Sequence, residues 1–535
     1  MPAMGTQSVG NRRAMRSHGV CDALAMGITV SKQTRPGGEA MGDTDRRRAL
    51  GQVLTPDWLV RDVLDVSGLG VGTSPYARVL EPSCGDGAFV TEIAHRKLEA
   101  CDALGIGTDG KAGCVRDGIV GVEIDAGLCE TARRRLAGEM ARHGIGDDAA
   151  ASVAREALRC GDALGIVPTL GRFDFVIGNP PYVRTHRIGR DGDTLPSWCG
   201  HGMTDLYIAF FQLGFDALAD DGVLGYVAPS SWLGSVAGSA MRDELTRGRN
   251  IRRIVDFGSE KAFDATGTYV AIAVLSREPN DDGVRWLPYD AYDRMRERAL
   301  AGDGAWETAP WDGMEASGRI LLADEGTQRR FVGICRRGNS DIDVRNGYQT
   351  SWDGFFVRHG DGVFDDGILI PVVKASTGEH AQCVFPYDRD TLAPMPLDEV
   401  MRLAGDGGRR ALMEARDRLA SRDGVTGDGW YLFGRTQAIG DTNAHKVTVS
   451  GMMRTHDDLK VVDAPPGTGV YGGAYVIGMG IDEVRDALSD DAFDGYVRLL
   501  GRRKSGGYCA FSAGELRRYL NWWHATHTTR EATGC

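Results

Sequence analysis

The first half of the chain alternates short apolar runs with longer stretches in which apolar residues recur at helical spacing. Short runs bounded by glycine or polar residues are typical of buried strands in a parallel sheet. They occur at residues 79–80, 119–123, 173–178, 223–228, 251–257 and 269–275. Because helical patterns fall between them, we predict one doubly wound α/β domain with a mainly parallel sheet over residues 46–280.

Polar residues follow several of these predicted strands, at the edge where ligands bind in sheets of this kind. Glu81, Glu123, Asp162 and Asn179 all fall there. A carboxylate at Glu123 can accept hydrogen bonds from both hydroxyl groups of a ribose, and Asp162 is placed where an adenine amino group could be recognised. A solvated loop carboxylate is the alternative for either residue alone, but three acidic strand ends in succession favour a binding site.

The segment Glu81–Phe89, with the sequence Glu-Pro-Ser-Cys-Gly-Asp-Gly-Ala-Phe, predicts a strand, a glycine turn and a helix. Glycines let a ligand approach the backbone closely, and the first turn of the helix offers free N–H groups. The spacing differs from the G-x-G-x-x-G dinucleotide pattern, and Glu81 and Asp86 would repel a pyrophosphate. A ligand with a positive charge and no phosphate fits better. Cys84 is interpreted as a small packed residue rather than a nucleophile.

The tetrapeptide Asn179-Pro180-Pro181-Tyr182 follows the apolar run 173–178. The first proline biases Asn179 toward an extended backbone and the two rings fix the next φ angles, so an amide and an aromatic ring are held in place. Such stiffness suits a site that grips a flat polar molecule. A proline-stiffened turn in which Tyr182 only caps the core is the alternative.

Three segments outside this pattern have simpler interpretations. Residues 1–45 show no sustained hydrophobic period, so we expect a mobile tail. Within Gly-Gln-Val-Leu-Thr-Pro at 51–56, Thr55 is expected to cap a helix whose first residue is Pro56. The stretch 101–118 is rich in glycine and aspartate, and we expect it to be an inserted surface loop.

Beyond about residue 280 the alternation fades. We expect a connector over 281–340 and a mixed α+β domain over 341–535, in which aromatic residues and glycines occur in short, irregular segments. Basic residues interleaved with aromatic ones are typical of a nucleic-acid surface, although solvated loops explain any one of them equally well. The candidate DNA contacts are Gln349, Thr350, Lys374, Arg435, Arg502, Arg503 and Lys504.

Composition narrows the class of protein. A chain of 535 residues favours two or three domains, and 42% hydrophobic with 25% charged residues is typical of globular, soluble proteins. No run reaches the roughly 18 to 20 apolar residues of a membrane span, and no secretory signal is evident, so a cytoplasmic, nucleoid-associated location is expected. The eleven cysteines contain no Cys-x-x-Cys pair, which indicates neither a disulfide framework nor a metal site.

The charge pattern bears on partners. A net charge of −12 is weak evidence against a nucleic-acid partner, because binding depends on a local basic face. Arginine supplies most of the 62 basic residues, and its guanidinium group suits bidentate contacts to phosphate or guanine. Compositional bias across the whole genome is the alternative explanation.

Together, these motifs resemble the class I, S-adenosylmethionine-dependent DNA adenine-N6 methyltransferases of restriction–modification systems, in the Eco57I/TaqI-like branch. The resemblance covers residues 51–275 well and 341–520 more loosely. It rests on Gly-Gln-x-x-Thr-Pro, Glu-Pro-x-x-Gly-x-Gly, Glu123, Gly161-Asp162-Ala163, Asn-Pro-Pro-Tyr, Gly347–Thr350 and Gly506–Tyr508. It implies a Rossmann-like methyltransferase domain followed by a target-recognition domain.

The resemblance also implies roles for individual residues. Asn179, Pro180, Pro181 and Tyr182 would form the catalytic motif that holds the target adenine, and Phe263 matches a position that stacks with Tyr182 on a flipped base. The candidate basic residues of the C-terminal half would contact double-stranded DNA. The residues implied to surround S-adenosylmethionine are Thr55, Glu81, Gly85, Gly87, Glu123, Asp162 and Asn179.

The implied activity is methyl transfer from S-adenosylmethionine to N6 of a flipped-out adenine, in a restriction–modification or phage-defence system. If the Asn179 side chain and the Pro180 carbonyl accept the amino hydrogens, no strong general base is needed. A cognate restriction endonuclease or specificity subunit is an expected partner. The alternatives are a bifunctional restriction–modification enzyme, a partner-dependent modification subunit, an RNA adenine or protein glutamine methyltransferase, and a non-catalytic DNA-binding module.

Overall fold

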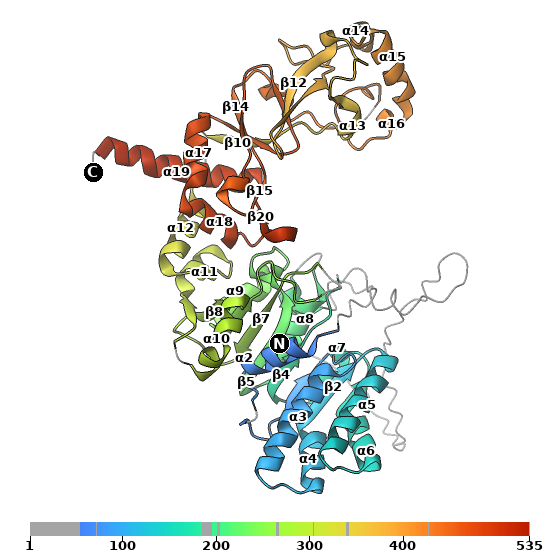
Figure 1. Ribbon diagram of the computed structural model, residues 1–535, viewed down its shortest axis with the longest axis vertical. Helices are drawn as coiled ribbons and strands as arrows, with labels where there is room; N and C mark the ends of the chain where they lie inside the picture. Colours follow the sequence, from blue (N-terminus) through green and yellow to red (C-terminus); the bar gives the residue numbers. More distant parts are fainter. Residues whose placement is uncertain are drawn as a thin grey trace, which may run out of the picture. The chain divides into compact units, whose positions relative to one another are not determined.

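The computed structural model describes residues 54–70, 72–183, 195–200, 204–263, 267–302, 304–338, 342–425 and 427–533 (Figure 1). The expectations for the tail 1–45 and for residues 51–53 lie outside these ranges. Side chains are described as far as residue 527. Within the described part of the chain, none of the helices combines the length and the apolar character that crossing a bilayer requires.

A nine-stranded sheet organises the first part of the chain, with strand order β3-β2-β1-β4-β5-β7-β6-β8-β9. Strands β3, β2, β1, β4 and β5 run parallel, whereas β7 runs antiparallel to both of its neighbours. The strands are β1 Val79–Glu81, β2 Ile119–Glu123, β3 Leu158–Cys160, β4 Phe173–Gly178, β5 Leu218–Pro229, β6 Ile251–Asp256, β7 Val270–Ser276, β8 Val284–Pro288 and β9 Glu307–Ala309. The predicted α/β fold with a mainly parallel sheet is confirmed.

Helices cover both faces of this sheet (Figure 1). In β4, the neighbours Val176 and Ile177 point to opposite faces and belong to separate hydrophobic clusters, as expected where a strand is buried on both sides. The helices are α2 Asp57–Val66, α3 Ala88–Ala103, α4 Thr108–Gly118, α5 Ala126–Arg142, α6 Asp147–Ala157, α7 Ala163–Ile166, α8 Leu206–Asp216, α9 Ser239–Arg247 and α10 Tyr289–Ala301. Residues of α2, α3, α5 and α6 pack in one cluster, and residues of α8 and α9 pack in the other.

Three local expectations were wrong. Residues 108–118 form helix α4 rather than a loop, because Cys114 and Val115 are buried against α3 and α6. Helix α2 begins at Asp57, with Pro56 rather than Thr55 at the N-cap and no side-chain cap. The sheet also continues past residue 280, since β8 pairs with β6 and β9 pairs with β8. The predicted boundary at 280 therefore falls inside the sheet.

The C-terminal region is a mixture of small sheets and helices, as predicted. Its sheets have strand orders β10-β18-β14-β16, β11-β13-β12-β17 and β15-β20-β19. The strands are β10 Asp343–Asn346, β11 Val357–Arg358, β12 Leu369–Lys374, β13 Glu379–Val384, β14 Lys446–Val449, β15 Met452–Met453, β16 Val461–Ala464, β17 Gly469–Tyr471, β18 Ala474–Ile477, β19 Arg503–Lys504 and β20 Tyr508–Ala510. The helices are α11 Trp311–Ser317, α12 Glu325–Arg336, α13 Asp353–Phe356, α14 Leu397–Leu403, α15 Gly405–Glu414, α16 Arg416–Ala420, α17 Ile481–Ser489, α18 Asp491–Leu499 and α19 Ala513–Thr533.

Short 3-10 turns complete the secondary structure of both regions. They are η1 Val167–Thr169, η4 Ser197–Cys199, η5 Ser230–Leu233, η6 Asp366–Ile368, η7 Ile439–Asp441, η8 His456–Asp458 and η9 Ser505–Gly507.

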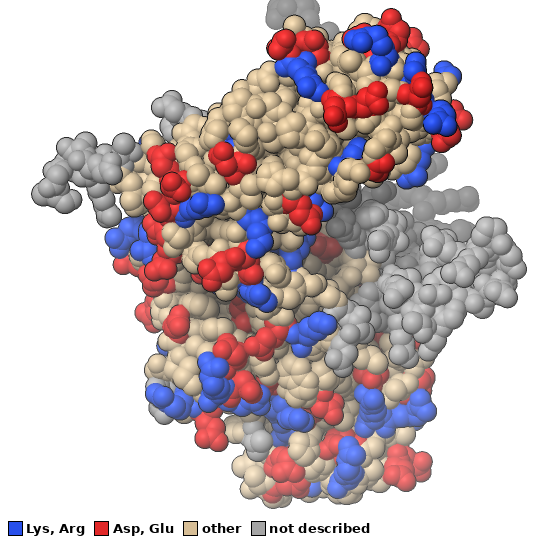
Figure 2. All heavy atoms as spheres, turned by 45° about the horizontal axis from the view of Figure 1, so that its top comes forward, with Lys and Arg blue, Asp and Glu red and all other residues tan. Residues whose placement is uncertain are grey.

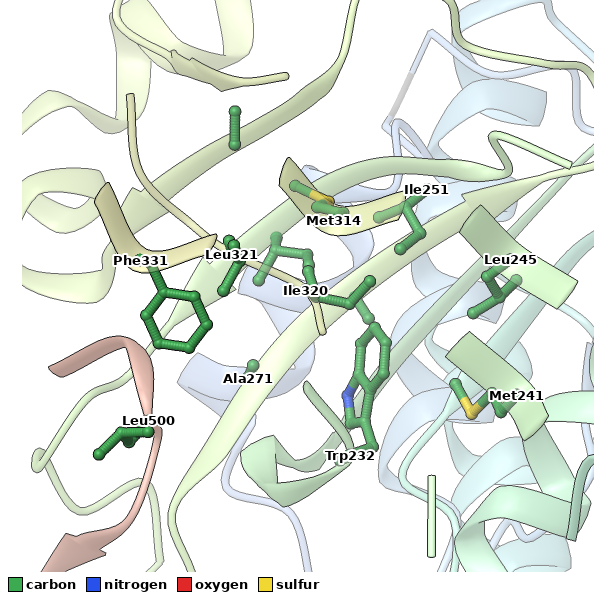
Figure 3. Packing of buried hydrophobic residues seen from close by; sticks show 14 of the residues in the cluster. Trp232, Met241, Leu245, Ile251, Ala271, Met314, Ile320, Leu321, Phe331 and Leu500 are labelled. Carbon is green, nitrogen blue, oxygen red and sulfur yellow. The ribbon is translucent and has the colours of Figure 1, made fainter. Parts of the chain in front are cut away.

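One hydrophobic cluster is shared by the large sheet and the C-terminal helices. Figure 3 shows Trp232, which follows β5, together with Ile320, Phe331 and Leu500. Phe331 on α12 also contacts Tyr496 on α18, with ring centroids 5.4 Å apart. The expected connector 281–340 therefore contributes two sheet strands and three packed helices, α10, α11 and α12.

Candidate active site

The predicted site residues meet at the carboxyl edge of the parallel strands. The order β3-β2-β1-β4 places Asp162, Glu123, Glu81 and Asn179 at consecutive strand ends. Backbone and side-chain hydrogen bonds connect these ends: the N–H of Gly161 donates to the Glu123 carbonyl at 2.8 Å, and the Ser83 hydroxyl donates to the Asn179 carbonyl at 3.1 Å. The sequence-based prediction that these residues lie together is thus met by the geometry of the sheet.

The glycine turn between β1 and α3 has the backbone that its sequence suggests. Gly85 and Gly87 have φ angles of 53° and 91°, in the left-handed region that favours glycine. A Cβ at Gly87 would lie 2.8 Å from the Ala132 Cα atom of α5, so this position also requires a residue without a side chain. A Cβ at Gly85 would meet nothing within 4 Å, so the backbone at Gly85 borders open space.

Glu81 is buried beneath this turn. Its Oε2 atom accepts the Val90 N–H of the first turn of α3 at 3.1 Å, which satisfies one of the free donors at the helix N-terminus. Burial, together with the nearby carboxylates of Asp86 and Glu123, raises the pKa of Glu81 well above its usual range. A cationic ligand close to Glu81 would favour the ionised form of this carboxyl.

Glu123 ends β2 and uses both carboxylate oxygens. Oε2 accepts the Gly85 N–H and Oε1 accepts the Asp125 N–H, each at 2.9 Å. Asp162 caps the short helix α7 by accepting the Leu164 N–H at 3.1 Å, which fixes its position next to the end of β3.

The Asn179 side chain is held by a residue far away in the sequence. Its Nδ2 atom donates to the Thr55 hydroxyl at 3.1 Å. Thr55 therefore orients the amide of Asn179 instead of capping α2. In this arrangement the Nδ2 atom faces Thr55 and the acceptor oxygen faces away from it.

Tyr182 and Phe263 form one aromatic wall, and Tyr182 follows Asn179 by three positions in the chain. Their ring centroids are 6.4 Å apart at an interplanar angle of 74°, an edge-to-face contact. The Tyr182 hydroxyl donates to the Val227 carbonyl at 3.3 Å, and burial raises the pKa of this hydroxyl. Tyr182 also packs against both hydrophobic clusters, so it contributes to the core as well as to the site. Phe263 is 4% exposed, and its role in stacking on a base stays a prediction.

The candidate DNA contacts fall in two places. Gln349 and Arg435 are both exposed and are joined by a backbone hydrogen bond from the Arg435 N–H to the Gln349 carbonyl at 3.1 Å. Lys374 ends β12, opposite Tyr471 of β17. Thr350 was a wrong choice, because it is 1% exposed and its hydroxyl donates to Asp353 at 2.6 Å.

The second group lies on the hairpin β19–β20. Lys504 is exposed, whereas Arg502 pairs with Glu515 at 3.1 Å and Arg503 pairs with Asp256 at the end of β6. Asp256 was not among the residues predicted from the sequence, although the rule that selected Glu123 applies equally to it, since both are acidic residues at the end of a predicted strand. Arg503 is thus committed to a partner in the large sheet.

The surface charge and a cavity elsewhere in the described part of the chain can be compared with this site. On the face drawn in Figure 2, basic and acidic side chains are intermingled, in keeping with the modest overall net charge of −12. A cavity of about 720 Å³, lined by Arg249, Asp281 and Glu315 among others, lies beside the amino ends of β6 and β8. It is at the opposite edge of the sheet from Asn179 and contains none of the predicted site residues.

Comparison with known proteins agrees with this geometry. Residues 117–263 match the family described as Eco57I restriction-modification methylase. The chain is 30% identical over 284 residues to the Type II methyltransferase M.PaeR7I of Pseudomonas aeruginosa, covering 51% of this chain and 48% of that protein. It is 30% identical over 396 residues to the Type II methyltransferase M.XamI of Xanthomonas campestris pv. amaranthicola, covering 69% of this chain and 67% of that protein. The match thus spans about half the length of the first of these relatives.

A solved structure supports the fold. The Type IIL restriction-modification enzyme MmeI, determined in complex with DNA, aligns with a TM-score of 0.55 at 12% sequence identity. The alignment covers 89% of this chain and 67% of that chain, so the likeness extends over both the large sheet and the C-terminal region.

Proposed function

This chain belongs to the type II methyltransferases of restriction–modification systems, and from that membership we propose that it transfers a methyl group from S-adenosylmethionine to N6 of an adenine in double-stranded DNA. The observation that carries the choice of substrate atom is the Asn179 amide, which donates to Thr55 and stands three positions before Tyr182 of the Tyr182–Phe263 wall. An oriented amide and an aromatic wall suit a planar base that carries an amino group. DNA as the substrate is in keeping with the family.

The chemistry of the strand ends fits S-adenosylmethionine. A carboxylate at the end of β2, as at Glu123, is placed to accept from the two ribose hydroxyls, and Asp162 at the end of β3 is placed to accept from the adenine amino group. Gly85 and Gly87 let the backbone turn without side chains beside the ligand, and the buried Glu81 suits the positive charges of the cofactor. The bound cofactor would supply an electrophilic methyl group on a sulfonium.

The residues of the motif would act on the adenine amino group. Its nitrogen is a poor nucleophile because its lone pair is delocalised into the ring. If the Asn179 oxygen and the Pro180 carbonyl accept its two N–H bonds, the nitrogen can become pyramidal and direct its lone pair outward. Acceptors placed for the charge that develops on the amine stabilise the transition state, and holding the base aligns it for transfer.

Reaching a base inside a duplex requires the base to leave the stack, at a cost of a few kcal/mol. Tyr182 and Phe263 are the rings available to stack on it, each of which could contribute about 1 to 3 kcal/mol. A base held against Tyr182 would sit beside Asn179, three residues away in a stiff segment.

The test is methyl transfer by the purified protein, measured with tritiated S-adenosylmethionine and duplex DNA. Asn179→Ala should abolish transfer while its dissociation constant for the cofactor stays within a few-fold of the wild-type value. Tyr182→Ala should lower the transfer rate more than cofactor affinity. Near-normal turnover by Asn179→Ala would refute the proposed role of the amide.

The proposal also includes a partner, a separate restriction endonuclease. A modification enzyme of this family would act beside a cognate restriction endonuclease that cuts the unmodified site. A combined activity is the second possibility, because the aligned MmeI is described as a restriction-modification enzyme. Incubating the purified protein with DNA and Mg²⁺, and examining the DNA for cleavage, separates the two.

A further inference from the structure

The hairpin β19–β20 belongs to the C-terminal region but reaches the carboxyl edge of the large sheet. Arg503 on β19 forms an ion pair with the carboxylate of Asp256, the last residue of β6. Asp256 is 8% exposed, and its second oxygen accepts the Gly258 N–H at 3.1 Å. A charge pair in such a place is sensitive to loss of either partner, because the remaining charge would be buried without compensation.

The backbone on both sides is shaped for this contact. Gly258 has a φ angle of 63°, and a Cβ there would lie 2.9 Å from the Nη1 atom of Arg503. Gly507, in the turn of the hairpin, also has a positive φ of 80°, and a Cβ there would lie 3.6 Å from the Ser259 hydroxyl. A side chain at Gly258 would displace the guanidinium group, so the absence of one makes the close approach possible.

The hairpin is anchored firmly at its base. Leu500, just before it, is buried in the cluster shared with the large sheet (Figure 3). The Leu500 carbonyl accepts a hydrogen bond from the Arg319 guanidinium at 2.7 Å, and the Ala510 N–H donates to the Arg502 carbonyl at 2.8 Å. The hairpin therefore provides a fixed support for whatever Arg503 holds.

Arg503 holds the segment that carries Phe263. From Asp256 the chain continues to Phe257, whose ring stacks on Tyr289 with centroids 4.1 Å apart. It then reaches Phe263, which meets Tyr182 edge-to-face. The segment 256–263 is thus fixed at its start by Arg503 and ends at the aromatic wall of the candidate site.

The exposed side of the same hairpin faces solvent. Lys504 is exposed, and Arg454 lies over the Tyr508 ring at 5.4 Å from its centroid. A basic and aromatic surface of this composition can bind a DNA backbone. The hairpin therefore has a basic, exposed side in addition to the side that contacts the segment 256–263.

We propose that Arg503 is a positioning residue: its pair with Asp256 holds the segment 256–263 so that Phe263 is set for the target base when the C-terminal domain engages DNA. This inference rests on the proposed methyltransferase function. It differs from the role expected from the sequence, in which Arg503 contacts DNA directly.

The test compares Arg503→Gln and Asp256→Asn with the matched control Arg498→Gln. Arg498 pairs with Asp494 within α18 and donates to the Arg454 carbonyl at 3.3 Å, so the control removes an arginine–aspartate pair near the hairpin whose partners lie outside the large sheet. The methyl acceptor is plasmid DNA isolated from cells that express the Asn179→Ala variant. Because this variant should not transfer methyl groups, the target sites of the plasmid should be unmethylated. Both test variants should lower kcat for methyl transfer by about tenfold or more, because small misplacement of reacting groups is costly. Their dissociation constants for this plasmid DNA and for S-adenosylmethionine should stay within about threefold of wild type.

Two further arms make the outcome decisive. The charge-swapped double variant, Asp256→Arg with Arg503→Asp, should recover part of the lost kcat, and Arg503→Lys should lose less than Arg503→Gln. Hydrogen exchange of peptides that cover 256–263 should be faster in Arg503→Gln and unchanged in Arg498→Gln. The exchange measurement does not depend on catalysis. It therefore tests the role of the ion pair even if the proposed methyl transfer is not observed.

Either of two results overturns the inference. A loss of DNA affinity with unchanged kcat in Arg503→Gln would make Arg503 a DNA contact. Unchanged exchange of 256–263 would show that the pair does not hold the segment, whatever the activity.

Discussion

At the scale of single residues, the orientation of the Asn179 amide depends on Thr55. The hydrogen bond between them joins a residue that precedes β1 in the chain to a residue that follows β4. If the Thr55 hydroxyl is removed, the amide loses the acceptor that fixes its Nδ2 side, and a hydrogen bond of this kind contributes about 1 kcal/mol.

Thr55→Val should therefore lower kcat for methyl transfer by about tenfold, because the acceptor oxygen would no longer be held toward the amine. Thr55→Ser keeps the hydroxyl and serves as the control, with kcat close to wild type. Steady-state transfer of tritiated methyl groups measures both variants. Equal rates for the valine and serine variants would contradict this role of Thr55.

Glu81 leads to a prediction about protons. Its raised pKa means that the buried carboxyl holds a proton at higher pH than an ordinary glutamate. A bound cation favours the ionised form and lowers this pKa. Cofactor binding should therefore release a proton at a pH between the pKa of Glu81 in the complex and its pKa in the free protein. Calorimetry of S-adenosylmethionine binding in buffers of different ionisation enthalpy measures that proton. Glu81→Gln should abolish the release, and a release of the same size in this variant would exclude Glu81 as its source.

Sequence-based prediction located the residues whose position follows from the fold. Glu81, Glu123, Asp162 and Asn179 lie together because the strand ends of this fold meet at one edge, and their roles in binding and catalysis stay predictions. Thr350 was wrong because nothing in a local sequence shows that a threonine will be buried against Asp353. The partner of Arg503 could not be found either, since Asp256 lies 247 positions away in the chain.

At the scale of elements, tertiary packing decided the cases that local patterns left weak. Helix α4 contains Gly110, Gly113 and Gly118, which lower helix propensity and favoured a loop in the sequence analysis. Its few apolar residues, Cys114 and Val115, are nevertheless buried against α3 and α6. The strands of the large sheet were predictable because their apolar runs are continuous and buried on both faces.

A buried carboxyl group, Asp62, lies where α2 packs on α10. Its pKa should be detectable in the pH dependence of the free energy of unfolding. Asp62 on α2 is fully buried, accepts the Tyr289 hydroxyl at 3.1 Å and pairs with Arg296 of α10. Burial raises the pKa of Asp62 to about 6. A raised folded-state pKa contributes stability that is present below the unfolded value of 3.8 and is lost as the pH rises through about 6.

Asp62→Asn removes this titration. Relative to the variant, wild type should lose about 1 to 3 kcal/mol of stability between about pH 4 and pH 7. The melting temperature of Asp62→Asn minus that of wild type should accordingly increase with pH over this range. A difference that is constant with pH would show that Asp62 has no raised pKa.

At the scale of the whole molecule, the net charge of −12 leaves DNA binding to local groups of basic residues. Log affinity for DNA falls with log salt concentration in proportion to the number of phosphates neutralised. Arg435 and Lys504 are exposed, and the C-terminal domain presents them at two separate places. The distribution of these residues, unlike the methyltransferase motifs, could be seen only in the folded chain.

Arg435→Gln and Lys504→Gln should each reduce the salt slope of DNA binding by about one if each neutralises one phosphate. Arg134→Gln, which removes an exposed arginine from α5, is the control and should leave the slope unchanged. Fluorescence anisotropy of a labelled duplex over a range of salt concentrations provides the slopes. An equal reduction in the control would indicate a general charge effect instead of two contacts.

We propose that this chain methylates adenine N6 in DNA through Asn179. The most direct measurement is mass spectrometry of nucleosides from the DNA of a host that lacks its own DNA methyltransferases and expresses either wild type or Asn179→Ala. We predict N6-methyl-2′-deoxyadenosine with wild type and none with Asn179→Ala, when both proteins are present at the same level. A methyl group on cytosine, equal N6-methyladenine in the two samples, or none in either would contradict the account.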